Sequence, residues 1–241
     1  MMKMKKVVLF TIIGLGLSAC GGGDDSSTPN NNNDSNAGGS TGNNNGAQYP
    51  VESVIIDLYT KGYSSEPLHA LEGMHEWERQ FEIIPKEDTV FKGKQVKSFE
   101  TLSTLKSNGG VVNMASSTSY FTAAPFVDVG GIEITRLYRT AIKNNTVPKF
   151  ANIGASGLIS NTVTYGDSRE TIKSNTAINT WSISKADNSN AWLCLDSTID
   201  YVMQGNLDED LSTCYKINVQ GNVLDSKYII KSANNLTFTS K

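Results

Sequence analysis

Residues 76–83 read Glu-Trp-Glu-Arg-Gln-Phe-Glu-Ile, so the large apolar side chains of Trp77, Phe81 and Ile83 alternate with acidic or amide side chains. Successive side chains of a β-strand point to opposite faces of the sheet, and a period of two therefore places one face in a core and the other in water. The stretch predicts an antiparallel strand, and similar strand patterns recur along the remaining sequence.

Similar β-rich runs follow along the chain, separated by turn signals rich in Gly, Asn and Asp. The runs cover residues 95–105, 110–120, 132–141, 158–165, 177–184, 191–195, 214–219, 227–231 and 236–239. The turn signals cover residues 107–110, 130–131, 143–145, 165–167, 187–190, 220–222 and 233–235. Many short strands predict a mainly β fold, a single antiparallel β-barrel or sandwich meander, with a short N-terminal helix and one disulfide.

The helix is predicted just after Pro50. Its apolar side chains follow the spacing i, i+3, i+4 and i+7 at Val51, Val54, Ile55 and Leu58. Proline near the start and Gly62 just past the end are typical helix boundaries. A strand through Val54, Ile56 and Leu58 is the competing prediction.

The N-terminus is typical of an export signal. Three lysines precede an apolar run over residues 7–17, which is too short to span a hydrocarbon core of ~30 Å as a helix. The run ends in Leu-Ser-Ala-Cys at Cys20, and residues 1–21 resemble the signal peptide and lipobox of bacterial lipoproteins. That resemblance implies removal of residues 1–19 and acylation of Cys20. Gly21 in the next position implies delivery to the outer membrane, and the alternative is an ordinary secretory signal with a chance cysteine.

Residues 20–48 are predicted to be the lipidated cysteine and a disordered Gly/Asn/Ser-rich tether. No large apolar side chain occurs in residues 21–48, so nothing there offsets the entropy of ordering. A flexible chain of this length spans roughly 30 Å. Residues 49–241 remain as one β-rich globular domain, long enough to bury a core.

The cysteines of the domain are predicted to form a disulfide. With Cys20 acylated, Cys194 and Cys214 remain as an even pair in an exported chain, each within a strand-like run. The alternative, a thiol nucleophile or a metal-binding pair, requires reduced cysteines.

The charge pattern excludes a class of partners. The chain holds 21 Lys and Arg against 24 Asp and Glu, a net charge of −3, with no dense basic cluster. Phosphate backbones are bound by basic patches, so nucleic acid is not an expected partner.

The two histidines do not form a recognisable metal motif. His75 and Glu76 lack the second histidine of H-E-x-x-H, because position 79 is arginine. We expect His69 and His75 to be surface residues among solvated carboxylates, with weak zinc binding as the alternative, and we predict no metal and no cofactor.

No catalytic constellation is assembled in the sequence, and we predict no enzyme. Gly154-Ala-Ser-Gly157 is not G-x-S-x-G. Ser-x-x-Lys occurs at 103–106 and at 182–185 without its companion motifs. Asn206, Asp208 and Asp210 are spaced as in a calcium loop, but the glycine and closing glutamate of that loop are missing.

Aromatic side chains are the other candidates for a binding site. Six of them could line a ligand pocket in a barrel or belong to a plain core: Tyr59, Tyr63, Tyr120, Phe121, Phe126 and Phe150. Trp181 and Trp192 are predicted to lie on neighbouring strands near the disulfide.

A second, local resemblance concerns residues 157–166, Trp192-Leu-Cys194 and Cys214. They are similar to the C-terminal sheet and disulfide loop of type IV pilins. The long N-terminal helix and the processing site of pilins are missing, so the likeness implies a shared hairpin-and-disulfide arrangement and not pilus assembly.

These observations predict a lipid-anchored outer-membrane protein, held to the membrane through Cys20, whose domain acts as a non-enzymatic binding module. Its partner would be a protein, a glycan or a small apolar ligand. The alternatives are a structural or assembly factor of the cell envelope and, third, a hydrolase.

Overall fold

The computed structural model describes residues 46–133, 136–202, 209–231 and 235–241. Cys20 and the predicted signal and tether up to residue 45 lie outside these residues, as do Asn206 and Asp208 of the calcium-like pattern. The predicted turn at 233–235 lies outside them except for Asn235.

Within the described residues the chain forms one short helix, α1, and fifteen strands. Their bounds are β1 (Gln48–Pro50), α1 (Val51–Lys61), β2 (Tyr63–Ser64), β3 (Leu68–Glu72), β4 (His75–Phe91), β5 (Lys94–Ser107), β6 (Gly110–Ala123), β7 (Phe126–Glu133), β8 (Tyr138–Asn144), β9 (Phe150–Asn152), β10 (Ser156–Tyr165), β11 (Lys173–Lys185), β12 (Ala191–Tyr201), β13 (Glu209–Ile217), β14 (Val223–Ile230) and β15 (Leu236–Thr239). The mainly β prediction is confirmed.

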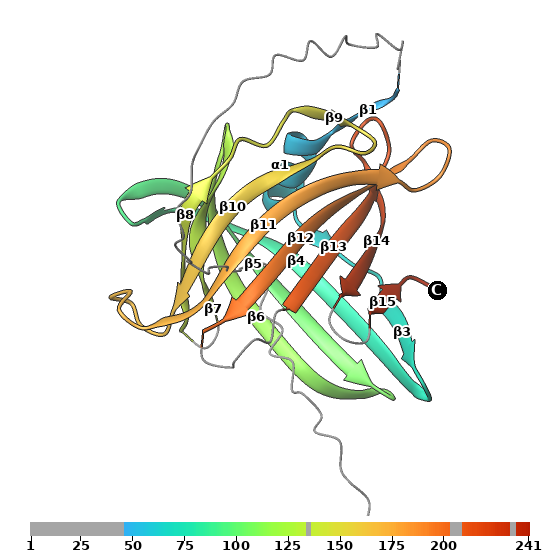
Figure 1. Cartoon of the computed structure of the whole chain (residues 1–241), viewed down its shortest axis with the longest axis horizontal. Helices are drawn as coiled ribbons and strands as arrows, with labels where there is room; N and C mark the ends of the chain where they lie inside the picture. Colours follow the sequence, from blue (N-terminus) through green and yellow to red (C-terminus); the bar gives the residue numbers. More distant parts are fainter. Residues whose placement is uncertain (1–45, 134–135, 203–208, 232–234) are drawn as a thin grey trace, which may run out of the picture.

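Twelve of the strands close into an antiparallel barrel (Figure 1). The order around the wall is β4-β3-β15-β14-β13-β12-β11-β10-β8-β7-β6-β5, and β5 pairs back with β4. Most neighbours are consecutive hairpins, but β3 meets β15 near the C-terminus, where His69 lies opposite Thr239. This long-range pairing closes the sheet, so the domain is a barrel and not a sandwich.

Helix α1 lies at one mouth of the barrel (Figure 1). The predicted apolar face, Val51, Val54, Ile55 and Leu58, is buried, so the helix prediction is confirmed and the competing strand is wrong. The start of the helix is tied down by backbone hydrogen bonds from Val51 N to Lys149 O (3.0 Å) and from Glu52 N to Pro148 O (3.2 Å). Strand β1 pairs with β9 beside it, so the helix is held across the mouth.

Two sequence predictions around β7 are wrong. The run predicted at 132–141 is not a single strand, because β7 ends at Glu133 and β8 begins at Tyr138. The turn predicted at Gly130-Gly131 lies inside β7, where the Arg139 guanidinium passes close to position 131. A β-carbon on Gly131 would lie 2.6 Å from the Thr118 carbonyl oxygen and 3.1 Å from Arg139 Nη2. Close approach, not turning, is the reason for glycine here.

The interior of the barrel has two halves. Apolar and aromatic side chains fill the half next to α1, and they come from nearly every strand of the wall. Farther from the helix the inner wall carries many buried polar side chains, including Thr101, Ser103, Ser117, Ser119, Glu133, Arg139, Ser160, Thr162, Thr164, Asn175, Asn179, Ser197 and Thr213. Where the two halves meet, the interior offers both apolar and hydrogen-bonding side chains.

Candidate binding cavity inside the barrel

The apolar half ends in a layer of four aromatic rings. Tyr59, at the end of α1, stacks on Phe99 of β5 with ring centroids 4.0 Å apart. Phe121 of β6 packs edge-on against Tyr59 with centroids 5.6 Å apart, and Phe126 of β7 tilts against Tyr59 with centroids 6.0 Å apart. Such arrangements stabilise by more than the burial of their area. The helix thus carries one ring of a layer that the sheet completes.

The polar half begins with a buried ion pair on the other side of this layer. Arg139 Nη1 donates a hydrogen bond to Asp128 Oδ2 at 2.8 Å, and the two side chains are 4% and 12% exposed. Arg139 Nη2 donates to Ser119 Oγ (3.0 Å) and to the Gly130 carbonyl oxygen (3.1 Å). A buried charge pair needs such additional hydrogen bonds to offset its desolvation.

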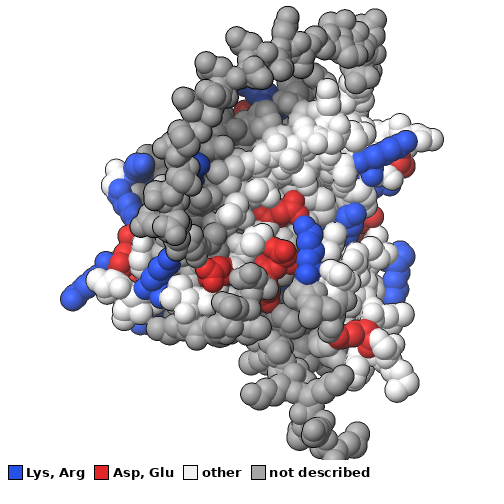
Figure 2. Space-filling model, in the orientation of Figure 1, with Lys and Arg blue, Asp and Glu red and all other residues white. Residues whose placement is uncertain are grey.

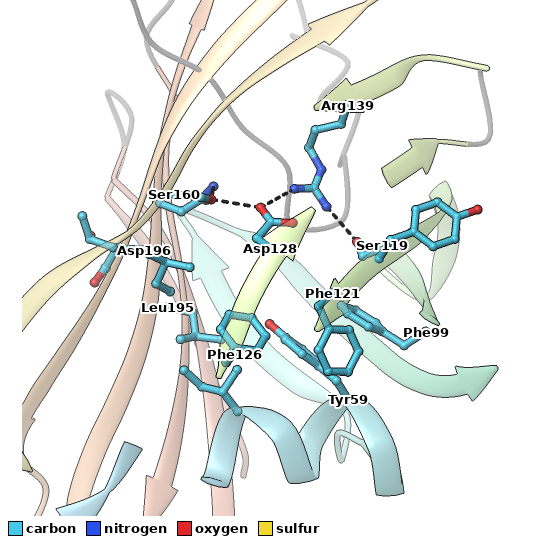
Figure 3. A pocket seen from close by; sticks show the side chains of 15 residues that line it. Tyr59, Phe99, Ser119, Phe121, Phe126, Asp128, Arg139, Ser160, Leu195 and Asp196 are labelled. Carbon is cyan, nitrogen blue, oxygen red and sulfur yellow. Dashed lines mark hydrogen bonds and ion pairs between the residues drawn. The ribbon is translucent and has the colours of Figure 1, made fainter. Parts of the chain in front are cut away.

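The same pair is linked to the neighbouring part of the wall, which continues from β8 through β10 (Figure 3). Ser160 Oγ of β10 donates to Asp128 Oδ2 at 2.9 Å. Asn179 Nδ2 of β11 donates to Ser160 Oγ at 2.8 Å, and Ser197 Oγ of β12 donates to Asn179 Oδ1 at 3.3 Å. The network joins six strands, so the side chains are held by the barrel itself.

A cavity lies between the aromatic layer and this network. It is partly open, and about 40 Å³ of it is available to the centres of water-sized molecules. At roughly 10–15 Å³ for each water, the space accommodates a few heavy atoms. The cavity is lined by Ile55, Tyr59, Phe99, Ser119, Tyr120, Phe121, Phe126, Asp128, Arg139, Ile159, Ser160, Asn179, Thr180, Leu195 and Asp196. One wall is apolar and the other can form hydrogen bonds (Figure 3).

The electrostatics of the cavity keep Tyr59 neutral. Burial raises the pKa of the Tyr59 hydroxyl, and the charge of Asp128 raises it further while Arg139 opposes this. The neutral phenol is a hydrogen-bond donor as well as an acceptor. Tyr59 therefore supplies a polar group to the apolar side of the cavity.

Deeper in the polar half, a row of three side chains lacks hydrogen-bond partners. Thr101 of β5 lies opposite Ser117 of β6, which lies opposite Glu133 of β7. Both Glu133 oxygens and both hydroxyl oxygens are buried without a partner. Burial raises the pKa of Glu133 to about 7, against the smaller opposing effect of Arg139. Burial thus brings the pKa of the Glu133 carboxyl close to neutrality.

Arg79 is the second buried charge of this half. Its side chain is 5% exposed, and its guanidinium carbon lies 3.7 Å from the centre of the Tyr228 ring. Nε and Nη1 have no hydrogen-bond partner, and burial lowers the pKa of Arg79. A cation over an aromatic face recovers part of the lost hydration.

The predicted disulfide between Cys194 and Cys214 is confirmed. The two residues lie directly opposite each other on β12 and β13, with their Cα atoms 4.0 Å apart. The prediction that both tryptophans lie beside it is half wrong. Trp181 belongs to the buried core inside the barrel, whereas Trp192 shares the outer face of β12 with Cys194 and packs under Lys227 Nζ at 4.3 Å. Alternation along β11 turns Trp181 inward.

Of the six aromatic candidates, four line the cavity and two do not. Tyr59, Phe121 and Phe126 line the cavity. Tyr63 packs against Phe81 and Tyr215 away from it. Tyr120 also lines the cavity and its ring stacks on Phe91 with centroids 4.2 Å apart, while Phe150 is 57% exposed and is not a pocket residue.

The histidines and the acidic loop that were considered as metal ligands do not come together in one site. His69 Nδ1 lies 3.7 Å from Glu76 Oε1, and His75 contacts Asn108. Within the described ranges no group of three metal-ligating side chains occurs. Asp210 accepts a hydrogen bond from Thr198 Oγ1 at 2.6 Å on the outer wall.

The Ser-x-x-Lys pairs are separated by strand alternation. Ser103 is buried inside the barrel, whereas Lys106 binds Glu78 at 2.6 Å on the outside. Ser182 donates to Asp196 Oδ2 at 3.1 Å, and Lys185 is exposed at the end of β11. Residues three apart on a strand face opposite sides of the sheet, so neither lysine can act as a base for its serine.

Sequence reasoning missed the polar side of the cavity. Asp128, Arg139, Ser160 and Asn179 belong to no motif. A weak signal existed in β10 and β11, where polar residues such as Ser160, Thr162, Asn175 and Asn179 interrupt the apolar inward face. No protein-family model, curated protein or solved structure matches the chain. No helix within the described ranges is long and apolar enough to cross a membrane.

Proposed function

We propose that the protein is a lipid-anchored outer-membrane binding protein whose barrel takes up a small molecule with an apolar body and a hydroxyl or amide group. The observation that carries the proposal is the cavity between the aromatic layer and the Arg139 network. The basic and apolar N-terminal signal, ending at Cys20, supports the anchor. The barrel acts by binding, without chemistry on the ligand.

The two walls of the cavity would contact different parts of the ligand. Rings of the aromatic layer contact the apolar body, and their burial supplies the affinity. The Tyr59 hydroxyl, Ser160 and Asn179 orient the polar group. Asp128 and Arg139 already satisfy each other, so the ligand does not need a charge. A molecule larger than a few heavy atoms extends through the open side of the cavity.

The experiment that tests this proposal uses phenol as the probe. Phenol is titrated into the full chain, and NMR chemical shifts of the cavity side chains are followed, with toluene as the probe that lacks the hydroxyl. We expect phenol to shift the resonances of Tyr59, Phe126 and Asn179 and to bind about tenfold more tightly than toluene, the worth of one good hydrogen bond.

The matched variants are Tyr59→Phe and Tyr63→Phe. The first removes the hydroxyl next to the cavity and keeps the ring layer, and we expect it to weaken phenol binding to the level of toluene. The second removes a hydroxyl of the same kind from a tyrosine that packs against Phe81 outside the cavity. Equal effects of the two variants, or an absence of phenol-induced shifts, would contradict the proposal.

A further inference from the structure

The loops around the mouth that holds α1 form one surface. Strand β1 pairs with β9, so Pro50 lies opposite Phe150. The turn between β13 and β14 packs at the same place, where a β-carbon on Gly221 would lie 2.9 Å from Pro50 Cγ. The turn between β11 and β12 is joined to β1 through Tyr49, whose hydroxyl donates to the Ser189 carbonyl oxygen at 3.4 Å. We call residues 145–155, 185–190 and 218–222 the mouth surface.

Large apolar side chains of the mouth surface are exposed. Phe150, Ile153 and Val219 are 57%, 45% and 41% exposed. They lie on segments that surround β1, where the described chain enters the domain. Removing such side chains from water is favourable, and their gathering at one end of a molecule is typical of a contact with a protein or a membrane.

The charge of the mouth surface is positive. Lys149 and Lys185 are exposed, and neither forms an ion pair with another residue of the described ranges. The one acidic residue in the sequence of these segments, Asp187, already pairs with Lys216 at 2.8 Å. On the face drawn in Figure 2, by contrast, Lys and Arg are interspersed with Asp and Glu. The mouth surface therefore suits an anionic partner, although the net charge of the chain is −3.

The other mouth of the barrel has exposed apolar side chains without such cations. Met74, between β3 and β4, is 98% exposed. The lysines of this region are each paired with a glutamate, Lys241 with Glu76 at 2.8 Å and Lys106 with Glu78 at 2.6 Å. An anionic surface attracts unpaired lysines, so it would meet the mouth surface in preference to this end.

The predicted anchor enters the domain on the same side as the mouth surface. The described chain begins at Gly46, directly before β1 and α1 (Figure 1). With Cys20 acylated, a tether with an r.m.s. span of roughly 30 Å joins this end of the barrel to the bilayer. Groups linked by a short flexible chain meet at an effective concentration in the millimolar range. A contact too weak to hold a free domain on a bilayer is then populated.

We propose that the mouth surface docks on the anionic lipid bilayer to which Cys20 is anchored, with Phe150 and Ile153 among the headgroups and the two lysines against lipid phosphates. The inference rests on the anchor of the proposed function and not on a ligand in the barrel. Apolar and aromatic side chains beside lysines are typical of contacts at a membrane interface. Docking places α1 between the bilayer and the candidate cavity.

The test compares fluorophores at the two ends of the full, acylated chain in vesicles that contain phosphatidylglycerol and a nitroxide-labelled lipid. The label is attached to Asn152→Cys on β9 or to Met74→Cys at the other mouth. Each is the only free thiol, because Cys20 is acylated and Cys194 is joined to Cys214. We expect the nitroxide to quench the label at position 152 about threefold more than the label at position 74, because the docked surface lies within the headgroup region. Flotation of the vesicles measures anchoring separately.

Phe150→Glu distinguishes docking from the random proximity of a tethered domain. It should reduce the quenching at position 152 to the level at position 74. Val111→Glu is the matched control, since Val111 is also 57% exposed but lies at the other mouth, and it should leave the quenching unchanged. The double variant Lys149→Glu/Lys185→Glu should weaken the quenching as Phe150→Glu does. Vesicles of phosphatidylcholine alone should do the same for the wild type, because they lack anionic headgroups.

The outcomes separate the docking from the anchor. A chain that does not float with the vesicles overturns both. A chain that floats but is quenched equally at the two positions overturns the docking and leaves the anchor intact. Quenching at position 152 that survives both Phe150→Glu and the double lysine variant also overturns the docking. Phenol binding in the barrel is a separate measurement and has no bearing on these results.

Discussion

Arg139 and Asp128 form a charge pair inside the barrel at 2.8 Å, and the side chains are 4% and 12% exposed. Their hydrogen bonds join the adjacent strands β7, β8 and β10, which border the candidate cavity. Gly131 has no side chain and therefore leaves room for the Arg139 guanidinium, so the buried ion pair depends on a glycine at this position of β7.

Removing Asp128 should leave an uncompensated buried charge. We expect Asp128→Ala to lower the free energy of unfolding by about 3–5 kcal/mol, because Arg139 then loses its partner away from water. The measurement is urea unfolding followed by circular dichroism. Asp57→Ala is the control, since Asp57 pairs with Lys61 at an exposed site and should cost less than about 1 kcal/mol. Equal losses would show that the Asp128 pair is not effectively buried.

Glu133 should make the protein less stable as the pH rises. Its pKa is about 7 in the folded protein, raised from 4.5 by burial, so the unfolded chain releases this proton first. Its contribution is absent below about pH 4.5, grows unfavourable through pH 7 and then stays constant at about 3 kcal/mol. Arg139 and Tyr201 are the neighbouring groups whose charges couple to it.

Glu133→Gln should therefore gain stability relative to the wild type at pH 8 but not at pH 4, as measured by unfolding at both values. Glu100→Gln is the opposite control. Hydrogen bonds from Lys86 and Ser116 lower the pKa of Glu100, so that carboxylate stabilises above its unfolded pKa and the benefit disappears as the pH falls. A Glu133→Gln variant with the pH profile of the wild type would contradict the prediction.

Gly131→Ala should be disruptive for steric reasons. The new methyl group would lie 2.6 Å from the Thr118 carbonyl oxygen, so the backbone of β6 or β7 must shift, at a cost of about 1–3 kcal/mol. At Gly110 the nearest atom to a new methyl group is 3.6 Å away, and Gly110→Ala should be tolerated. Thermal unfolding of the two variants compares them, and a similar melting temperature for both would refute the steric account.

The disulfide should contribute through the loop that it closes. Cys194 and Cys214 are separated by 20 residues, and cross-linking a loop of this length stabilises by about 3 kcal/mol in the loop-entropy model. The double variant Cys194→Ala/Cys214→Ala is therefore expected to fold with that loss of unfolding free energy. The comparison is made by urea unfolding, and a loss near zero would mean that the hairpin of β12 and β13 already restrains the unfolded chain.

Acylation of Cys20 remains a prediction from the sequence. Labelled palmitate should be incorporated into the wild-type chain in bacterial cells and not into Cys20→Ser, which removes the thiol without changing the preceding residues. Cys194→Ala/Cys214→Ala should still be labelled. Incorporation into Cys20→Ser would show that the resemblance of residues 1–21 to a lipobox is misleading.

Local patterns in the sequence determined the elements. The alternation of Trp77, Phe81 and Ile83 lies on β4, and the spacing of Val51 and Leu58 defines α1, because period and burial are set by local backbone geometry. The even pair of domain cysteines likewise identified the disulfide. The prediction of one strand over 132–141 was wrong because β7 ends at Glu133 and β8 begins at Tyr138 with no glycine or proline between them to mark the boundary.

Tertiary structure alone decided which faces became the interior. Pairing of His69 with Thr239 closes the wall, and no local pattern encodes a contact between strands so distant in the chain. Ser160 and Asn179 then lie inside, where the usual rule of apolar side chains inward would not place them. Their burial is tolerated because neighbouring strands supply hydrogen bonds to them: Asn179 of β11 lies directly opposite Ser160 of β10 and donates to it, and Ser160 donates to Asp128 of β7.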